Sequence, residues 1–233
     1  MIRVEKGLYR SGTFALAADF ELNAGSFCAV LGPSGAGKST LLSVIAGFEP
    51  LVSGDVYLDE KNMAGIAPAQ RPVSMVFQDT NSFSHLTVWN NVALGISPAL
   101  KLNAKQSDLV NAALQKAGLV DLKERRPSEL SGGERQRIAL ARMLVRNKPI
   151  LLLDEPFAAL DPALRGEMLD LVLELQREHR LTVLMVTHQP HDAELAADGI
   201  VFVSDGIVHQ PMNPKAFFGS REIAITNYLG RRG

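Results

Sequence analysis

The sequence predicts an α/β core with an antiparallel β subdomain towards the N-terminus and an α-helical subdomain inserted within it. Three observations lead to this fold class. Apolar runs at residues 27–31, 150–153 and 181–187 are short enough to be single buried strands. Apolar residues with helical spacing follow such runs, as expected for a sheet covered by helices. Over residues 79–146 the β-branched runs thin out and helical spacing takes over, which indicates the inserted segment.

Strand signals dominate the N-terminal third of the chain. Turn residues separate the runs, with a break at residues 23–25 and a Gly- and Pro-containing loop at residues 65–68. A short helix is expected to end at Gly47, because glycine is common directly after a helix. The expected elements are strands at residues 2–9, 13–22, 27–31, 54–58 and 73–77, and a helix at residues 40–46.

Helices and buried strands alternate over the rest of the chain. Asp161 and Pro162 are typical of a helix start, because Asp caps free N–H groups and Pro fits the first turn. Asp205 and Gly206 are the strongest short signal for a hairpin. The expected elements are helices at residues 105–117 and 134–145, a strand at residues 150–153, a helix after Asp161, a strand at residues 181–187, and hairpin strands at residues 200–203 and 207–209.

Composition limits the classes of function. The chain has 233 residues, which is about one and a half domains at roughly 150 residues per domain. Lys and Arg total 24 against 25 for Asp and Glu, so general nucleic-acid binding is disfavoured. The single cysteine, Cys28, excludes an internal disulfide, and the first residues lack the order of a secretory signal. No apolar run approaches the roughly 20 residues that span a bilayer, so we expect a cytosolic protein whose membrane role depends on a partner.

A glycine-rich loop at residues 32–39 fits the pattern G-x-x-x-x-G-K-[ST] and lies between an expected strand and an expected helix. Glycines let successive N–H groups point at phosphate oxygens, and the helix N-terminus adds partial positive charge. Lys38 is expected to reach the β- and γ-phosphates, and the Ser39 hydroxyl to bind Mg²⁺. The residues assigned to the nucleotide here are Gly32, Pro33, Ser34, Gly35, Ala36, Gly37, Lys38, Ser39 and Thr40.

Two carboxylates follow the apolar strand at residues 150–153. In an open parallel sheet, ligands bind beyond the carboxyl ends of the strands. Asp154 is therefore expected to complete the Mg²⁺ shell, usually through water. Glu155 is the candidate that polarises the attacking water.

A second glycine motif opens the helix expected at residues 134–145. Ser131 is a typical helix N-cap, and Gly132, Gly133 and Glu134 follow it, which predicts a second anion site built from N–H groups. With the phosphate loop, this motif resembles the nucleotide-binding subunits of ATP-binding-cassette (ABC) transporters, whose signature is close to Leu-Ser-Gly-Gly-Gln. The resemblance implies a P-loop NTPase core of the RecA-like kind, ATP and Mg²⁺ as ligands, and a head-to-tail dimer in which the signature of one copy covers the γ-phosphate held by the other.

Further residues match the family in the family's order. Tyr9 matches the aromatic residue that stacks on adenine, and Gln78 the glutamine that touches Mg²⁺ or water. Asp161 matches the segment across the dimer seam, and His188 the histidine that contacts the γ-phosphate. Glu134 stands where the family usually has glutamine, and this change in charge is expected to weaken closure of the dimer. The assignment stands, because the resemblance implies that Ser131, Gly132 and Gly133 make the main phosphate contacts. Taken singly, Tyr9, Gln78 and His188 also fit plain structural roles, so their joint order favours the functional interpretation.

The resemblance also implies partners in a membrane. Residues 83–89 include Phe83 and Trp89 and are unusually apolar for a surface loop, which favours a docking groove for a membrane permease subunit. Packing of these side chains inside the helical subdomain is the alternative. The implied protein is one ABC ATPase domain over residues 1–233, with a core at 1–78 and 147–233 and a helical subdomain at 79–146. It would lie on the cytoplasmic face of the inner membrane, and a periplasmic substrate-binding protein would be an indirect partner.

Residues 71–78, 83–88 and 101–103 resemble, more narrowly, the ATPase subunits of bacterial thiamine importers. The implied function is ATP hydrolysis that drives import of thiamine or its phosphates. Importers of ferric iron, sulfate, molybdate or polyamines remain alternatives. A soluble ABC ATPase acting on nucleic acid or ribosomes, and a simple P-loop kinase, are alternatives from other classes. The first usually has a coiled-coil insertion or two cassettes in one chain, and the second leaves the signature unused.

Overall fold

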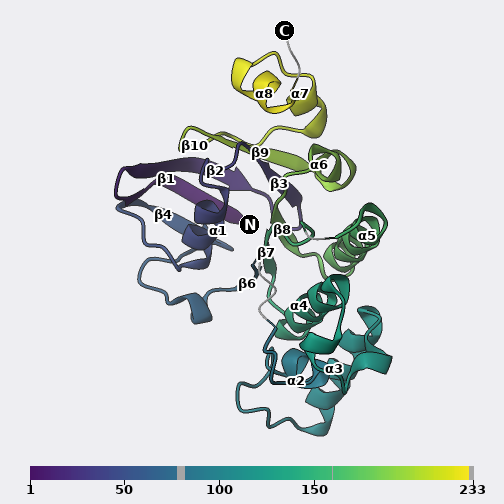
Figure 1. Ribbon diagram of the computed structural model, residues 1–233. Helices are drawn as coiled ribbons and strands as arrows, with labels where there is room; N and C mark the ends of the chain where they lie inside the picture. The colour runs from purple at the N-terminus through teal and green to yellow at the C-terminus, as the bar shows by residue number, and fades with distance from the viewer. Residues whose placement is uncertain (78–81, 159, 231–233) are drawn as a thin grey trace.

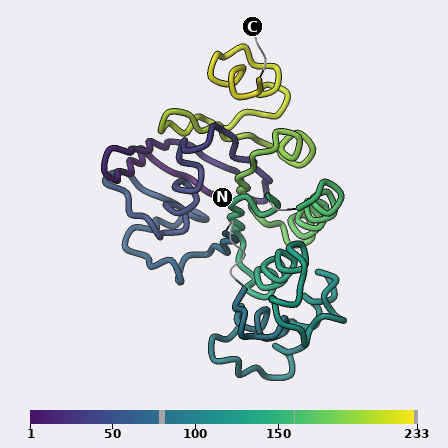
Figure 2. Tube along the Cα trace, viewed as in Figure 1, coloured from purple at the N-terminus to yellow at the C-terminus, as the bar shows by residue number. Residues whose placement is uncertain are grey.

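The protein is described from a computed structural model, in which residues 1–77, 82–158 and 160–230 are described. Figure 1 shows one twisted sheet with helices beside it, a group of helices formed by the middle of the chain, and two short helices near the C-terminus. The trace in Figure 2 shows that the helical group extends away from the sheet at the end opposite the C-terminal helices.

One ten-stranded sheet organises the described residues, in the order β5-β4-β1-β2-β10-β9-β3-β8-β7-β6. Neighbours from β9 to β6 pair in parallel, whereas β1, β2, β4 and β5 pair antiparallel. Strand β10 joins the two parts, since it pairs parallel with β2 and antiparallel with β9. The strands are β1 (Ile2–Ser11), β2 (Phe14–Leu22), β3 (Phe27–Leu31), β4 (Ser53–Leu58), β5 (Lys61–Asn62), β6 (Val73–Val76), β7 (Ile150–Asp154), β8 (Thr182–Val186), β9 (Gly199–Ser204) and β10 (Ile207–Val208).

Burial explains the two kinds of strand. Every residue of β3, β7 and β8 is buried, as expected for parallel strands with both faces covered. In β2, buried and exposed residues alternate, because its other face meets solvent. A register shift between Val4 and Gly7 interrupts β1, so residues on either side of the shift are not on one regular repeat.

Helices supply the remaining layers. The longer ones start at side-chain caps: Asn103 for α3, Ser131 for α4 and Asp161 for α5 each accept a hydrogen bond from a backbone N–H of the first turn. The helices are α1 (Lys38–Ala46), α2 (Val88–Ala93), α3 (Ala104–Lys116), α4 (Gly132–Arg146), α5 (Pro162–His179), α6 (Pro190–Ala196), α7 (Pro214–Phe218) and α8 (Ile223–Tyr228), with 3₁₀ turns at Pro68–Gln70, Val120–Leu122 and Pro127–Glu129.

The helical group has a hydrophobic core of its own, to which α2, α3 and α4 contribute. Helix α4 also reaches the main core: Ile138 and Ala141 belong to the helical cluster, and Leu140 and Met143 to the cluster beside β7 and α5. This helix therefore ties the helical group to the sheet. The subdomain boundaries at residues 79 and 146 stay a prediction.

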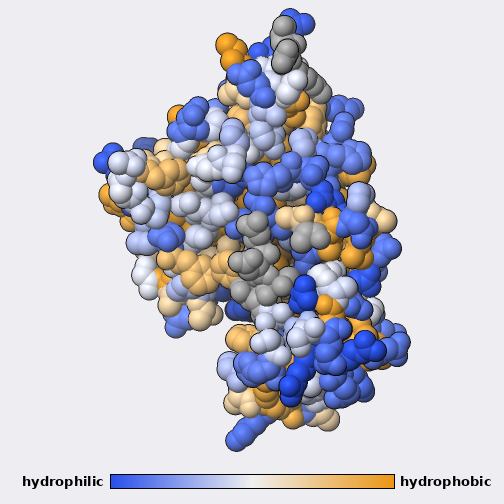
Figure 3. All heavy atoms as spheres, in the orientation of Figure 1, coloured by the Kyte–Doolittle hydropathy of each residue, from blue (hydrophilic) through white to orange (hydrophobic). Residues whose placement is uncertain are grey.

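Several short elements were not predicted from the sequence, namely β5, α2, α6, α7 and α8. Each has seven residues or fewer, too few for a hydrophobic repeat to be visible. No helix within the described ranges is both long enough and apolar enough to span a lipid bilayer. The face drawn in Figure 3 mixes hydrophilic and hydrophobic side chains, with no broad apolar belt across it.

Candidate active site

The glycine-rich loop joins β3 to α1, as predicted. Gly32 has φ 152° and Gly37 has φ 108°, values in the region that favours glycine. A Cβ atom on Gly32 would collide with the carbonyl oxygen of Val203, and one on Gly37 would lie 2.8 Å from Phe14. The loop therefore needs glycine at both positions for conformation and for space.

Lys38 is buried in the loop that precedes it, with an exposed fraction of 5%. Its Nζ donates to the carbonyl oxygens of Gly32 at 2.9 Å and Pro33 at 2.8 Å. Burial lowers the pKa of Lys38, and the nearby carboxylates of Glu155 and Asp154 oppose that shift. The ammonium group is thus held at the loop by two neutral acceptors and two anions.

Ser39 and Asp154 meet, although 115 residues separate them in the sequence. Ser39 Oγ donates to Asp154 Oδ1 at 3.0 Å. Asp154 is 7% exposed at the end of β7, and burial raises its pKa while the hydrogen bond from Ser39 lowers it. A hydroxyl and a carboxylate placed together suit Mg²⁺, which binds a few protein oxygens and keeps several waters.

Glu155 and His188 form a close pair beside the loop. Glu155 Oε1 lies 2.6 Å from His188 Nε2, with side-chain exposure of 12% and 43% respectively. Glu155 has φ 46°, a left-handed value that is uncommon for a residue with a side chain, and its amide donates to Val186 at 3.1 Å. Such conformations cluster at functional sites, because the surrounding structure must hold them.

Lys38, Ser39, Glu155 and His188 line one cavity of about 300 Å³. Asp154 is hydrogen-bonded to Ser39 but is not among the lining residues. Among the described residues, Phe14 is the one aromatic residue besides His188 that lines the cavity, and no sequence motif indicated it. Tyr9 is 9% exposed, and its ring centroid lies 6.4 Å from that of Phe14. The alternation of β2 makes Phe14 look like a core residue, so sequence alone did not single it out. The lining comprises Phe14, Ser34, Gly35, Gly37, Lys38, Ser39, Thr40, Glu155 and His188.

The signature turn lies elsewhere in the chain, at the start of α4. Ser131 Oγ accepts from the Glu134 amide at 3.3 Å, and Glu134 Oε2 accepts from the Ser131 amide at 2.7 Å. This capping box accounts for the glutamate, since hydrogen bonds with Ser131 lower the pKa of Glu134 and stabilise its carboxylate. Space around a Cβ on Gly132 is open, whereas one on Gly133 would overlap Leu164 of α5.

The structure brings together some of the predicted site residues and separates others. The phosphate loop, Asp154, Glu155 and His188 meet, whereas the signature turn is absent from their cavity. Asp161 is the exposed N-cap of α5, accepting from the Leu164 amide at 3.0 Å. Gln78 lies outside the described residues. The roles of Tyr9, Gln78, Asp161 and the signature turn stay predictions.

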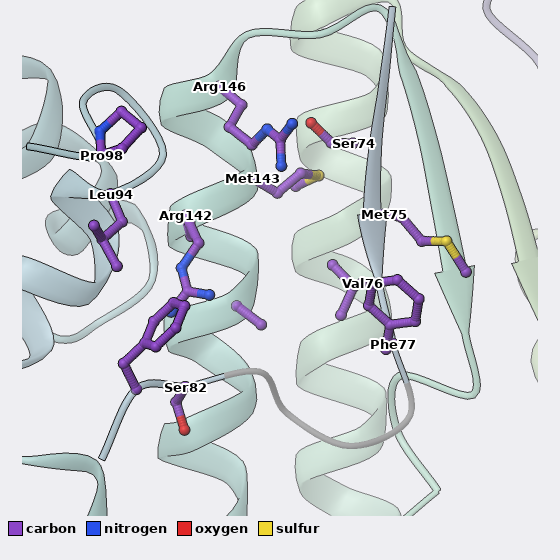
Figure 4. Close-up of a pocket in the computed structure, with 12 residues that line it drawn as sticks. Ser74, Met75, Val76, Phe77, Ser82, Leu94, Pro98, Arg142, Met143 and Arg146 are labelled. Atoms are coloured by element: carbon purple, nitrogen blue, oxygen red, sulfur yellow. The ribbon is translucent and has the colours of Figure 1, made fainter. Parts of the chain in front are cut away.

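A second cavity, of about 620 Å³, lies between β6 and the helical group. Figure 4 shows it between β6 and α4, with Met75, Met143 and Arg146 among the side chains around it. Phe83 is 46% exposed at this cavity, and the Arg142 guanidinium lies 5.3 Å from the centre of its ring.

Trp89 packs against the helical cluster, and its Nε1 donates to Asn111 Oδ1 at 3.2 Å. The two aromatic residues of residues 83–89 thus differ. Phe83 is available at the surface of the second cavity, whereas the alternative of internal packing applies to Trp89.

Comparison with known proteins identifies the family. The sequence profile of the ABC transporter family matches residues 16–158. The chain belongs to that family. The family resemblance that the motifs predicted is thereby confirmed, and membership implies ATP binding.

Relatives and solved structures of ABC proteins are similar to this chain over most or nearly all of its length. The thiamine import ATP-binding protein ThiQ of Ruegeria sp. (strain TM1040) is 48% identical over 99% of this chain and 100% of its own length. ThiQ of Vibrio cholerae is 54% identical over 82% of this chain and 81% of its own.

Among solved structures, cbiO1 from Clostridium perfringens, part of an ABC transporter complex, has a TM-score of 0.85 at 32% identity and covers 99% of this chain and 96% of its own. A dimeric ATP-binding cassette in a post-hydrolysis state with ADP and Pi has a TM-score of 0.78 at 28% identity, with 92% and 99% covered. These likenesses confirm the predicted fold class.

Proposed function

We propose that this chain hydrolyses MgATP as the ATP-binding subunit of an importer for thiamine or its phosphates. The observation that carries the proposal is a cavity lined by Lys38, Ser39 and the Glu155–His188 pair, with Asp154 hydrogen-bonded to Ser39. The names of the relatives, similar over nearly the whole chain, support the transported substrate. ATP supplies the energy, and this subunit does not contact the transported molecule.

The loop residues bind and orient the triphosphate. Pro33, Ser34 and Gly35 are exposed, so the loop backbone beyond Gly32 is open to a ligand, and Lys38 adds a fixed positive charge. Ser39 and Asp154 would hold Mg²⁺, with Gln78 as the proposed third contact. When bound, Mg²⁺ neutralises charge on the phosphate oxygens.

Glu155 is the proposed general base. Its carboxylate accepts a proton from the attacking water, and the turn after β7 holds it beside the phosphate loop. His188 orients that carboxylate through the 2.6 Å contact and, when protonated, brings positive charge towards the γ-phosphate. Phe14 and Tyr9 are the candidate aromatic surfaces for adenine, with Phe14 at the cavity itself.

A second copy of the chain would complete the site. The signature turn of Ser131, Gly132, Gly133 and Glu134 does not line the cavity of its own chain, yet Ser131 and Gly132 are exposed. In a head-to-tail dimer, the signature turn and Asp161 of one copy cover the nucleotide of the other. The dimeric cassette with ADP and Pi, to which this chain is similar, supports this arrangement.

The proposed membrane partner is a permease subunit that docks at the second cavity near residues 83–89, where Phe83 is exposed. Through that contact the protein would be a peripheral subunit on the cytoplasmic face of the inner membrane. A periplasmic protein would deliver the substrate to the permease. The proposed layout is one ABC ATPase domain, with its core at residues 1–78 and 147–233 and its helical subdomain at 79–146.

Reconstitution tests the proposal. The chain, co-purified with the permease subunits of a thiamine importer and placed in proteoliposomes, is supplied with MgATP inside and a loaded binding protein outside. We expect thiamine uptake that requires ATP and is abolished by Glu155→Gln. Uptake of ferric iron, sulfate, molybdate or a polyamine in place of thiamine would overturn the substrate assignment, and ATP-independent uptake would overturn the ATPase role.

A further inference from the structure

The turn that presents His188 is held by hydrogen bonds of the residue before it. Thr187 is 6% exposed at the end of β8, and its amide donates to the carbonyl of Val30 at 3.3 Å. Val30 belongs to β3, the strand that leads into the phosphate loop. The backbone just before His188 is thus tied to the strand that positions the loop.

The hydroxyl of Thr187 makes two further bonds. Its Oγ1 donates to Asp192 Oδ2 at 3.1 Å and accepts from the Gln189 amide at 3.1 Å. One bond fixes the residue after His188, and the other ties the strand end to the first turn of α6. A threonine side chain suits this task, because branching at Cβ restricts its rotamers.

Asp192 is the buried carboxylate that the proposed mechanism does not use. It is 6% exposed, and its amide donates to the Gln189 carbonyl at 3.1 Å, so its bonds also close the turn around His188. A buried carboxylate is retained at such a position only when its charge is met by hydrogen bonds.

Packing alone does not hold this turn. A cavity of about 250 Å³ lies beside it, lined by Glu155, Thr187, His188 and Asp192 among others. Glu155 and His188 also line the nucleotide cavity, so their contact has open space on two sides. The hydrogen bonds of Thr187 therefore carry the positioning that neighbouring side chains supply elsewhere in the core.

We infer that Thr187 and Asp192 are positioning residues for His188. The hydrogen bonds that join Thr187 to Gln189 and to Asp192, called the bracket below, hold His188 Nε2 against Glu155 Oε1. The inference rests on the proposed function, since it assigns the bracket to ATP hydrolysis. Loss of the bracket lets His188 move within the open space while the phosphate loop keeps its shape. The rate of hydrolysis falls, and nucleotide affinity stays.

The test compares Thr187→Val with Thr182→Val in the full chain, purified with its membrane subunits. Thr182 is a matched control: it lies in the strand that precedes Thr187, is 3% exposed, and its Oγ1 accepts a hydrogen bond from the Gly25 amide at 3.0 Å. It begins β8, whereas Thr187 follows the last residue of that strand. Both variants replace a buried hydroxyl by a methyl group of similar size.

We expect Thr187→Val to lower kcat for ATP about ten- to hundredfold with KM within about twofold, since small misplacements of catalytic groups have effects of this order. Thr182→Val keeps kcat, whatever its effect on the melting temperature. Thr187→Ser, which retains the hydroxyl, keeps most of the parent kcat. Asp192→Asn, which retains an acceptor oxygen, lowers kcat less than Asp192→Ala does. Equal losses of kcat in Thr187→Val and Thr182→Val would overturn the inference.

A double variant separates the inference from the function on which it rests. In a His188→Ala background, Thr187→Val has no further effect on kcat, because its action passes through His188. Additive losses overturn the positioning role. A His188→Ala chain that hydrolyses ATP at the original rate instead overturns the proposed function of the Glu155–His188 pair. If Thr187→Val does not fold, the contrast between Asp192→Asn and Asp192→Ala decides the same question.

Discussion

The two glycine motifs of this chain differ in how much of their surroundings the chain itself supplies. Around the phosphate loop, Lys38 bonds to loop carbonyls, Ser39 meets Asp154, and Glu155 meets His188. At the signature turn, the polar groups of Ser131 and Glu134 bond to each other, and Ser131 and Gly132 are exposed while Gly133 is buried. The chain itself supplies the polar groups around the first motif, whereas the second motif is a capped helix N-terminus at the surface.

The phosphate loop is therefore preorganised within one chain, whereas the signature turn needs a phosphate supplied from outside its own surroundings. Groups held in place before a ligand arrives need little reorganisation during the reaction, which is the condition for electrostatic catalysis. A self-satisfied helix N-terminus still carries partial positive charge, but it needs a phosphate brought from elsewhere. Substitutions at the phosphate loop site should therefore change the rate of hydrolysis or the nucleotide affinity of each chain. Substitutions at the signature turn should instead change the association of two chains.

The largest effect is expected for Glu155→Gln. Removal of the proposed general base is expected to lower the ATPase rate by about 10²–10⁴-fold. Nucleotide binding stays, because the loop, Lys38 and the Ser39–Asp154 pair are unchanged, and the ATP-bound dimer should accumulate. Steady-state ATPase assays and size-exclusion chromatography with MgATP measure both. Glu167→Gln is the control, since this glutamate is exposed and pairs with Arg137 at 3.0 Å; equal rates for the two variants would refute the assignment.

Lys38→Ala comes next and should act on binding. Loss of the buried ammonium removes charged hydrogen bonds to phosphate worth about 1.5–3 kcal/mol, so affinity falls roughly ten- to hundredfold. Equilibrium titration with a fluorescent ATP analogue measures the Kd. The control is Lys116→Ala, because Lys116 forms an exposed ion pair with Glu178 away from the cavity. Unchanged affinity in Lys38→Ala would contradict the proposed site.

The two signature glycines should separate stability from assembly. Gly133→Ala introduces a Cβ that overlaps Leu164, so we expect a loss of about 1–3 kcal/mol in the free energy of unfolding. Gly132→Ala meets open space, so its free energy of unfolding stays close to that of the parent, while closure of the dimer over ATP weakens. Urea denaturation and ATP-dependent dimerisation read out the two effects. Equal destabilisation by both substitutions would contradict the packing described for α4 and α5.

Glu134→Gln is expected to have the smallest effect. Glutamine retains the bond to the Ser131 amide but loses the charge at the helix N-terminus, so unfolding becomes easier by about 0.3–1 kcal/mol at neutral pH. Removal of the negative charge should also strengthen ATP-dependent dimer formation. Thermal melts and analytical ultracentrifugation measure these changes. Weaker dimer formation in the variant would show that the carboxylate assists closure.

The pH dependence of that effect has a definite sign. Bonds with Ser131 lower the pKa of Glu134 from its ordinary value of 4.5. A group with a lowered folded-state pKa stabilises the fold above its unfolded-state pKa, and the contribution is lost as the pH falls through the folded-state value. The difference in melting temperature between the parent and Glu134→Gln should therefore be full at pH 6–8 and shrink at acid pH. A difference that grows on acidification would contradict the capping box.

Local motifs were predictable because they depend on residues adjacent in sequence. The phosphate loop, the Ser131 cap and the Asp161 cap each need a few residues in a fixed order. The meeting of Ser39 with Asp154 was also predictable, since ligand residues gather beyond the carboxyl ends of parallel strands. The short helices α6, α7 and α8 were not, because tertiary packing rather than periodicity stabilises helices of this length.

The burial of the aromatic residues could not be predicted from the sequence. Tyr9 and Phe14 lie on paired strands, and only the packing decides that Phe14 lines the cavity while Tyr9 is buried, with its ring centroid 6.4 Å from that of Phe14. Phe83 and Trp89 lie in one apolar stretch, but one is exposed and the other packs in the helical cluster. Which face of a residue is covered depends on segments far away in sequence.

The sequence by itself determined the α/β class, the phosphate loop, the acidic strand end and the family, because each depends on the order of nearby residues and on simple rules of sheet geometry. Only the tertiary structure decided the contact between Glu155 and His188, the hydrogen bond of Thr187 to Asp192 beside it, and the separation of the signature turn from the cavity at the phosphate loop. The physical reason is that distances of about 3 Å between distant segments result from packing of the whole core, which no local pattern encodes.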